Sequence, residues 1–365
     1  MSTALSTSAE LPADRPARGL LGLAERGLLP DALVRLGIRR LCAERLRTER
    51  RGGPAVEAER LAKQLDALRA SPVAIFTEAA NTQHYELPAA FFAQCLGPHL
   101  KYSCCYFPSG NESLGAAEQA MLELYLERAE LADGQQILEL GCGWGALTLW
   151  MAERLPNAHI TAVSNSHSQR RHIEAQCRAR GLSNVHVLTR DVNALILDAG
   201  RFDRCVSIEM FEHMRNYATL MQRIATWLAP GGKLFAHLFA HRTLLYPFET
   251  AGHDNWLGRH FFTGGLMPSA DTLLHFQSHL ALERRWLIDG THYRRTAELW
   301  LANQDEHREH VMEVLHATYG AAAPLWFARW RIFWMACAEL FGYADGSEWL
   351  VAHYRFVRPL DAVTA

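Results

Sequence analysis

Short apolar runs alternate with helical stretches through the middle of the chain. The runs are ILEL (137–140), HITAVS (159–164), NVHVL (184–188), RCVSIEM (204–210) and GKLFAHLF (232–239). Turn signals stand between the apolar and the helical stretches. This alternation is typical of βαβ units, in which helices connect parallel strands. We therefore expect an α/β domain with a mostly parallel sheet over residues 131–245.

The regions on either side of this domain have helical patterns. Residues 1–18 show no periodicity and are expected to be a disordered tail. Residues 19–130 are expected to form a helical N-terminal region with helices at 31–51 and 56–69. Residues 246–365 are helix-biased and aromatic, which predicts a helical substrate cap that also contributes the final strand of the sheet.

Two of these helical segments have a functional and a structural interpretation. The segment DALVRLGIRRLCAERLRTERR (31–51) predicts a basic amphipathic helix, which either contacts anionic lipid or covers the core with a solvated charged face. Trp326, Trp330 and Trp334 recur every four residues on one helical face. They form either an aromatic core stripe or a wall of a substrate pocket.

Composition narrows the class of protein. The chain has 37 Lys+Arg against 39 Asp+Glu, and 49% of its residues are apolar, which excludes a polycationic nucleic-acid binder and a disordered chain. Its eight cysteines include no CxxC pair, so we expect neither a metal site nor a disulfide framework. With no signal-peptide pattern and no apolar run near 18 residues, a cytoplasmic location is expected.

The most specific motif is ILELGCGWG (137–145), which a helical pattern follows. A strand that ends in an acid and continues through G-x-G-x-G lets the backbone approach a ligand closely. The spacing of Gly141, Gly143 and Gly145 differs from the dinucleotide pattern G-x-G-x-x-G. Glu139 can also pair with a ligand ammonium group. Both features favour S-adenosylmethionine over NAD as the cofactor.

Polar groups at the ends of the next two strands fit the same cofactor. Asn165, Ser166 and Gln169 offer neutral hydrogen-bonding groups to a ribose. Asp191, which Val192 follows, stands at the end of the third strand and can accept a hydrogen bond from an adenine amino group.

Together with the motifs that follow, these features resemble the cyclopropane fatty acid synthase superfamily of S-adenosylmethionine-dependent methyltransferases. The shared motifs are HYELPAAFF (84–92), KYSCCYF (101–107), ELGCGWG (139–145), EMFEH (209–213) and PS (268–269). Across its length the chain is more similar to the coclaurine N-methyltransferase-like branch, through ERA (127–129), NSHSQ (165–169), MRNY (214–217), HFF (260–262) and AELFGYADGSEW (338–349).

The resemblance implies a class I methyltransferase Rossmann-like sheet and adds cofactor-binding residues. Tyr102 and Ser103 are implied at the cofactor, and the rings of Tyr85 and Tyr102 can face its positive sulfur.

The resemblance also implies two different catalytic groups. In ring-forming and C-methylating relatives a bicarbonate ion is the base, and its side-chain ligands correspond here to Cys104, Glu212, His237 and Tyr293, with main chain from Phe239. Amine methylases typically have serine, glutamate and phenylalanine where Cys104, His237 and Tyr293 stand. The glutamate at position 209, in contrast, is a feature shared with the amine branch, because the lipid enzymes usually carry glycine at that position.

Our leading hypothesis from the sequence is methyl transfer to the double bond of a lipid-like acyl chain, with bicarbonate as base. The alternative is N-methylation of a small aromatic amine, with Glu209, Glu212 and His213 as the catalytic group. The expected partners are the lipid or small-molecule acceptor and an anionic membrane surface, and the sequence leaves a homo-oligomer open.

Overall fold

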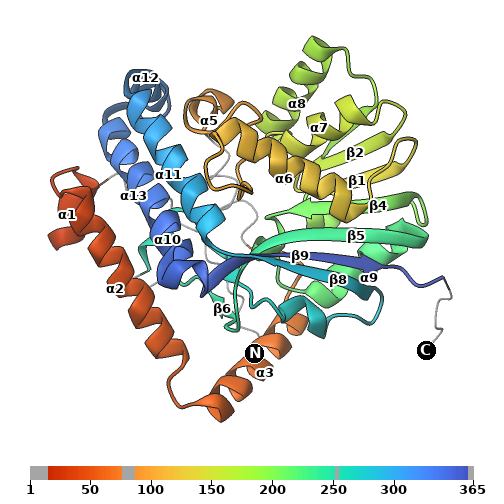
Figure 1. Ribbon diagram of the computed structural model, residues 1–365, viewed down its shortest axis with the longest axis horizontal. Coiled ribbons are helices and arrows are strands. Elements are labelled where there is room, and N and C mark those ends of the chain that lie inside the picture. Colours follow the sequence, from red (N-terminus) through yellow and green to blue (C-terminus); the bar gives the residue numbers. More distant parts are fainter. Residues whose placement is uncertain (1–14, 76–86, 251–254, 361–365) are drawn as a thin grey trace, which may run out of the picture.

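The protein is described by a computed structural model over residues 15–75, 87–250 and 255–360 (Figure 1). The prediction of a disordered tail therefore falls mostly outside the described residues. The central feature is a seven-stranded sheet with the strand order β3-β2-β1-β4-β5-β9-β8. Its strands are β1 Gln136–Leu140, β2 His159–Ser164, β3 Val185–Thr189, β4 Phe202–Ile208, β5 Leu228–His241, β8 Ala281–Ile288 and β9 Trp349–Val357.

The expected α/β sheet is confirmed, and all five predicted strands are present. Strands β3, β2, β1, β4 and β5 are parallel, and β9 and β8 extend the sheet in antiparallel pairing. Leu140 pairs with Val163 on β2 and with Ser207 on β4, so the carboxyl ends of three strands meet at one edge. That edge of a parallel sheet is where ligands bind in doubly wound folds.

Helices cover both faces of the sheet and form a separate layer beside it (Figure 1). The N-terminal helices are α1 Gly19–Glu25, α2 Asp31–Glu49, α3 Pro54–Ala70, α5 Ala89–Cys95 and α6 Leu114–Ala129. Within and after the sheet follow α7 Ala146–Arg154, α8 His167–Arg180, α9 Tyr217–Trp227 and α10 Trp256–His260. The cap helices are α11 Thr291–Glu306, α12 Arg308–Tyr319 and α13 Ala323–Phe341, and α13 packs against both α11 and α2.

The cap region contains a strand that the sequence pattern did not predict. Besides the expected final strand β9, residues 281–288 form β8 at the edge of the sheet. Most of its side chains are exposed, so the strand lacks the clear alternation of apolar and polar residues that marks a half-buried strand. A two-stranded ribbon, β6 Tyr246–Pro247 with β7 Leu266–Met267, lies outside the main sheet.

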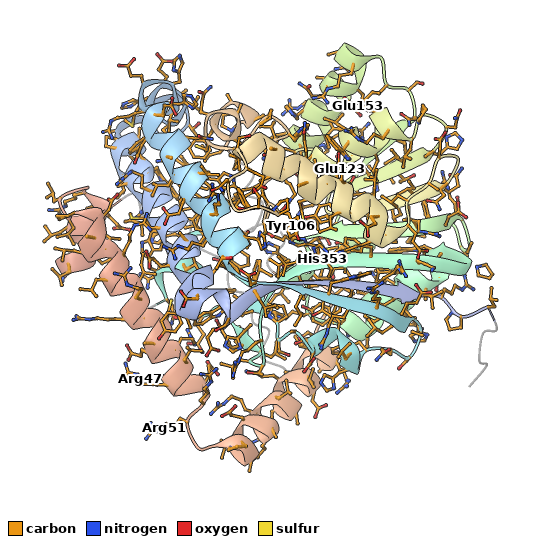
Figure 2. All side chains as sticks on the ribbon, viewed as in Figure 1. Arg47, Arg51, Tyr106, Glu123, Glu153 and His353 are labelled. Atoms are coloured by element: carbon orange, nitrogen blue, oxygen red, sulfur yellow. The ribbon has the colours of Figure 1, made fainter. Side chains whose placement is uncertain are left out.

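Helix α2 forms where the basic amphipathic helix is predicted, and ion pairs hold it on the cap. Arg35 pairs with Glu298 of α11 and Glu339 of α13, at 2.5 and 3.0 Å. Arg47 and Arg51 lie exposed toward the C-terminal end of this segment (Figure 2). No helix in the described part of the chain is long and apolar enough to cross a membrane. Contact with an anionic membrane surface and self-association stay predictions.

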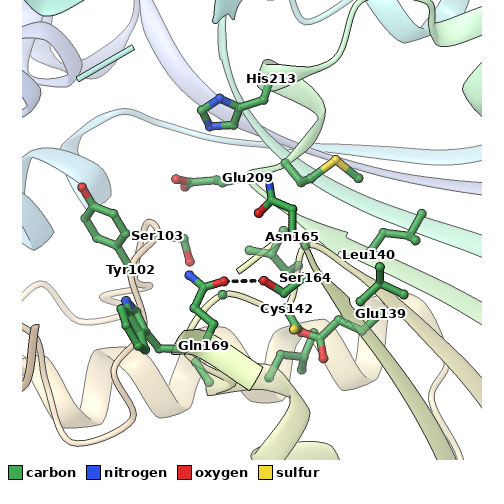
Figure 3. A pocket seen from close by; sticks show the side chains of 18 of the residues that line it. Tyr102, Ser103, Glu139, Leu140, Cys142, Ser164, Asn165, Gln169, Glu209 and His213 are labelled. Carbon is green, nitrogen blue, oxygen red and sulfur yellow. Dashed lines mark hydrogen bonds between the residues drawn. The ribbon is translucent and has the colours of Figure 1, made fainter. Parts of the chain in front are cut away.

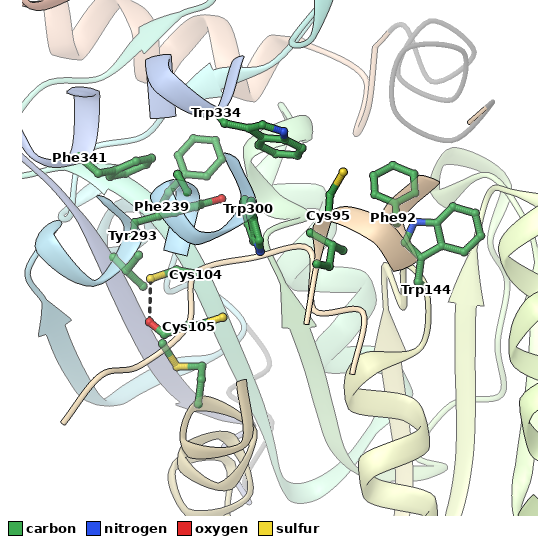
Figure 4. Packing of buried hydrophobic residues seen from close by; sticks show 14 of the residues in the cluster. Phe92, Cys95, Cys104, Cys105, Trp144, Phe239, Tyr293, Trp300, Trp334 and Phe341 are labelled. Atoms are coloured by element: carbon green, nitrogen blue, oxygen red, sulfur yellow. Dashed lines mark hydrogen bonds between the residues drawn. The ribbon is translucent and has the colours of Figure 1, made fainter. Parts of the chain in front are cut away.

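The tryptophan stripe of α13 belongs to the core. Trp330 and Trp334 are fully buried, with ring centroids 5.0 Å apart, and Trp326 is 5% exposed. Trp334 also packs against Trp300 of α11 at 5.2 Å and donates a hydrogen bond from its indole nitrogen to Gln304. Figure 4 shows Trp334 and Trp300 among the other buried rings of this cluster. The core interpretation of the stripe is therefore the one that the structure supports.

Candidate active site

A cavity lies at the carboxyl ends of β1, β2 and β4, and the glycine loop forms part of its wall. Gly141 and Gly143 both have positive φ, at 79° and 52°, which favours glycine. A Cβ atom on Gly141 would also lie 2.8 Å from the Cβ of Met210, so the loop has no room for a side chain there. The cavity encloses about 1290 Å³ of space, including its open mouth.

Two buried polar groups in this cavity fit S-adenosylmethionine. Glu139 is 3% exposed and accepts a hydrogen bond from the Thr148 hydroxyl at 2.5 Å; burial raises its pKa to about 8. Gln169 accepts from the Ser164 hydroxyl at 2.6 Å (Figure 3). Its amide nitrogen is buried and has no hydrogen-bond partner among the described residues. A ligand ammonium would pair with Glu139, and a ribose hydroxyl would satisfy Gln169.

Most of the cofactor residues predicted from the sequence line this cavity: Tyr102, Ser103, Glu139, Gly141, Gly143, Asn165, Gln169 and Val192. The other three shape the turns around it. Gly145 is the N-cap of α7, and the Ser166 hydroxyl accepts from the Gln169 backbone at the start of α8. The Asp191 carboxylate accepts from the Asn193 backbone. Tyr85 lies outside the described residues.

The sequence motifs did not indicate five further lining residues, namely Lys101, Ser164, Arg190, Thr263 and Gly264. The first three are sequence neighbours of residues already predicted, so their position beside a motif is a signal that could have indicated them. Thr263 and Gly264 come from a loop after α10, and only the tertiary fold brings that loop to the cavity.

A second cavity adjoins the first, with about 680 Å³ of space including its mouth. Its wall is mainly aromatic and apolar: Phe239, Phe248, Leu257, Phe262, Met267, Tyr293, Trp300, Phe333, Cys337, Leu340 and Phe341. Three residues line both cavities, namely Tyr102, Glu209 and His213. A methyl donor in the first cavity and an acceptor in the second would therefore meet at these three side chains.

Glu209 occupies an unusual backbone conformation at this boundary. The apolar run was predicted to continue to Met210, but β4 ends at Ile208 because Glu209 has a φ of 48°. A positive φ is uncommon for a residue other than glycine and is typical of functional sites. The turn sends the Glu209 side chain toward the boundary of the two cavities (Figure 3).

Three donors hold the Glu209 carboxylate. Its Oε1 atom accepts from the backbone N–H of Cys104 at 3.0 Å and lies 3.0 Å from Nε2 of His237. Its Oε2 atom accepts from the Tyr293 hydroxyl at 2.7 Å. Burial raises the pKa of Glu209, whereas the Cys104 N–H, the Lys101 ammonium and Tyr293 lower it.

These contacts do not fit the bicarbonate site that the resemblance implies. His237 and Tyr293 bind the Glu209 carboxylate, and Cys104 adds its backbone N–H. The Cys104 thiol instead donates to the Cys105 carbonyl at 3.2 Å (Figure 4). Three of the expected ligands thus contact a side-chain carboxylate, and the comparisons give no support for bicarbonate.

The structure separates Glu212 from the two cavities. Its Oε1 atom accepts from the Phe239 backbone at 2.6 Å, and its buried Oε2 atom has no hydrogen-bond partner in the described residues. Burial, followed by the nearby Glu209 charge, raises the pKa of Glu212 well above its usual value. The resemblance implies Glu212 in both catalytic groups, and that role stays a prediction. Of the three residues in the amine group, Glu209 and His213 line both cavities and Glu212 lines neither.

Comparison with known proteins shows the family of this chain. Residues 75–346 match the family model described as mycolic acid cyclopropane synthetase. The chain belongs to this family. The (S)-coclaurine N-methyltransferase of Thalictrum flavum subsp. glaucum is 37% identical over 342 residues, which cover 92% of this chain and 94% of the relative.

Two further relatives show that the chain is more similar to the amine branch than to the lipid branch. A crystal structure of coclaurine N-methyltransferase bound to N-methylheliamine and SAH superposes with a TM-score of 0.89 at 36% identity, covering 92% of this chain and 98% of that one. The cyclopropane-fatty-acyl-phospholipid synthase of Escherichia coli K12 is 31% identical over 221 residues, 60% of this chain and 54% of the relative. The family member described here is an S-adenosylmethionine-dependent methyltransferase, and the amine alternative is better supported than the lipid hypothesis.

Proposed function

We propose that this enzyme transfers the methyl group of S-adenosylmethionine to the nitrogen of a small amine that carries an aromatic ring. The observation that carries the proposal is the Glu209 carboxylate, which faces an aromatic cavity at its junction with the cofactor cavity. A buried anion in an apolar pocket favours a cationic or hydrogen-bond-donating acceptor. An alkene offers neither property.

The residues around the junction fit the needs of amine methylation. S-adenosylmethionine supplies an electrophilic methyl carbon on a sulfonium group. The amine attacks with its nitrogen lone pair, so the nitrogen must be neutral, and one proton must leave it. Glu209 is suited to take that proton, because burial moves its pKa from the usual acidic value toward neutrality.

Aromatic side chains would orient the acceptor. Tyr293 stacks on Phe341 with ring centroids 4.2 Å apart, and His213 stacks on Phe262 at 4.8 Å. Flat rings on several sides of the cavity fit an aromatic acceptor and bring its nitrogen into one position.

We further propose that this enzyme works without bicarbonate, because the Glu209 carboxylate accepts the hydrogen bonds that the ion would accept in the lipid enzymes. The test is S-adenosylhomocysteine release from heliamine, tetrahydroisoquinoline and phenethylamine, and separately from vesicles of unsaturated phospholipid, each with and without added bicarbonate. We expect turnover on at least one amine at a rate that bicarbonate leaves unchanged. Turnover on lipid that rises with bicarbonate, with none on the amines, would overturn the proposal.

A further inference from the structure

A chain of hydrogen bonds runs from helix α6 through two strands to Glu209. Nη1 of Arg128 lies 2.8 Å from Nδ1 of His353, and Nε2 of His353 lies 2.9 Å from Nδ1 of His237. His237 then contacts the Glu209 carboxylate through Nε2 at 3.0 Å. The two histidines are fully buried and stand opposite each other in the register of β5 and β9. Figure 2 shows His353 in the sheet.

Arg128 fixes the direction of every hydrogen bond in this chain. A guanidinium group only donates, so Nδ1 of His353 must be the acceptor. A neutral imidazole with an acceptor at Nδ1 carries its proton on Nε2, and His353 therefore donates to Nδ1 of His237. His237 in turn carries its proton on Nε2 and donates to Glu209.

Two other contacts agree with the same direction. The Tyr125 hydroxyl lies 2.9 Å from the same Nδ1 atom of His237 and can share that acceptor with His353. At the far end, a carboxylate accepts and does not donate. Reversing the chain would set the N–H of His353 against the N–H of Arg128 in a buried site, which is costly. Burial lowers the pKa of both histidines well below the usual value, so both are neutral.

We propose that Arg128 and His353 are positioning residues for catalysis, which fix His237 as a hydrogen-bond donor and thereby hold the Glu209 carboxylate at the junction of the two cavities. Neither residue lines the cofactor cavity or the aromatic cavity beside it. The inference rests on the proposed function, because that function gives Glu209 its place beside the amine.

The tautomers can be measured without any acceptor. Long-range proton–nitrogen NMR spectra of the full chain labelled with [15N]histidine distinguish the two neutral forms, and the variants His237→Gln and His353→Gln assign the signals. We expect both residues to carry the proton on Nε2 in the unchanged protein. In Arg128→Met the Nδ1–H form of His353 should appear. A proton on Nδ1 of His353 in the unchanged protein, or tautomers that Arg128→Met leaves unaltered, would overturn the inference.

Kinetics with heliamine as acceptor supplies the second readout. Loss of the donor in Arg128→Met or His353→Leu should lower kcat about tenfold, the effect of losing one hydrogen bond to a charged group, with an unchanged KM for S-adenosylmethionine. Arg128→Lys and His353→Gln keep a donor in place and should recover most of kcat. Glu123→Gln, an exposed change on the same helix, should match the unchanged enzyme.

Comparing the conservative with the non-conservative substitution at each position separates a positioning role from an effect on folding. Arg128 also lies over the Trp286 ring at 5.0 Å, so its loss can weaken packing as well. Equal loss of kcat in His353→Gln and His353→Leu at equal melting temperature would overturn the positioning role. If no amine is turned over, the proposed function fails, and the NMR result still supports or overturns the hydrogen-bond direction.

Discussion

The Tyr293 hydroxyl donates a 2.7 Å hydrogen bond to Oε2 of Glu209 and so connects helix α11 of the cap to the end of strand β4. The bond joins two parts of the chain that are 84 residues apart. One residue of the cap thus helps to hold the carboxylate that faces the acceptor cavity. Cap docking and placement of the Glu209 carboxylate are therefore coupled in this fold.

Removing the charge of Glu209 should abolish most of the methylation. Glu209→Gln keeps the size of the side chain but cannot accept a proton from the amine, so we expect kcat to fall about 10²- to 10³-fold. Binding of S-adenosylmethionine, measured by calorimetry, should change little, because the ligand would pair with Glu139 and Gln169, which also line this cavity. Activity of Glu209→Gln near that of the unchanged enzyme would exclude Glu209 as the base.

A small anion should rescue the variant Glu209→Gly. Glycine tolerates the positive φ at this position, and its introduction leaves the Cys104 N–H, His237 and Tyr293 as unpaired donors around a small space. Formate carries the same carboxylate group and fits such a site. S-adenosylhomocysteine release from heliamine should be low without formate and rise with its concentration. Glu212→Gly, which opens a space away from both cavities, should show no such rise.

Loss of the Tyr293 hydroxyl should move the pH profile of the reaction. The hydroxyl lowers the pKa of Glu209, so Tyr293→Phe raises that pKa. Because the base works only when ionised, the acidic limb of kcat against pH should shift to higher pH. Tyr106→Phe, whose hydroxyl lies outside both cavities, serves as the control. A limb that stays in place in Tyr293→Phe would show that another group controls it.

Much of this site follows from short-range sequence signals. The glycine loop and the polar residues after β2 fall at strand ends, where an alternating pattern already predicts a ligand edge. Glu209 was a candidate only through the family resemblance, and its surroundings could not be predicted from short-range signals. Its partners Cys104, His237 and Tyr293 come from a loop, a strand and a cap helix, and only tertiary packing shows that they surround one carboxylate. The polar strand β8 was missed because its edge position leaves most side chains exposed.

Filling the acceptor cavity should affect the acceptor and not the cofactor. Cys337 of α13 lines the aromatic cavity and does not line the cofactor cavity. Cys337→Phe should therefore reduce the volume of the aromatic cavity. We expect the KM for heliamine to rise about tenfold, which corresponds to roughly 1.4 kcal/mol of lost binding. The affinity for S-adenosylmethionine should stay the same. A parallel loss of cofactor affinity would indicate that the substitution disturbs the junction itself.

The stability of the ligand-free protein should fall as the pH rises from 6.5 to 8. Burial raises the pKa of Glu139 to about 8 and that of Glu118 to about 7, so above the unfolded-state value near 4.5 the folded protein binds more protons than the unfolded chain. Raising the pH therefore favours unfolding until these groups have lost their protons. The buried histidines act in the opposite sense, but only below their unfolded-state pKa near 6.5.

Glu139→Gln should reduce this pH dependence. The amide keeps the hydrogen-bonding shape of the protonated acid and has no proton to lose, so the melting temperature should fall less between pH 6.5 and 8 than in the unchanged protein. Scanning calorimetry at several pH values measures the slope, with Glu123→Gln as an exposed control that should leave it unaltered. If Glu139→Gln keeps the full slope, Glu139 is already ionised in the ligand-free protein, and its pairing with a ligand ammonium would release no proton.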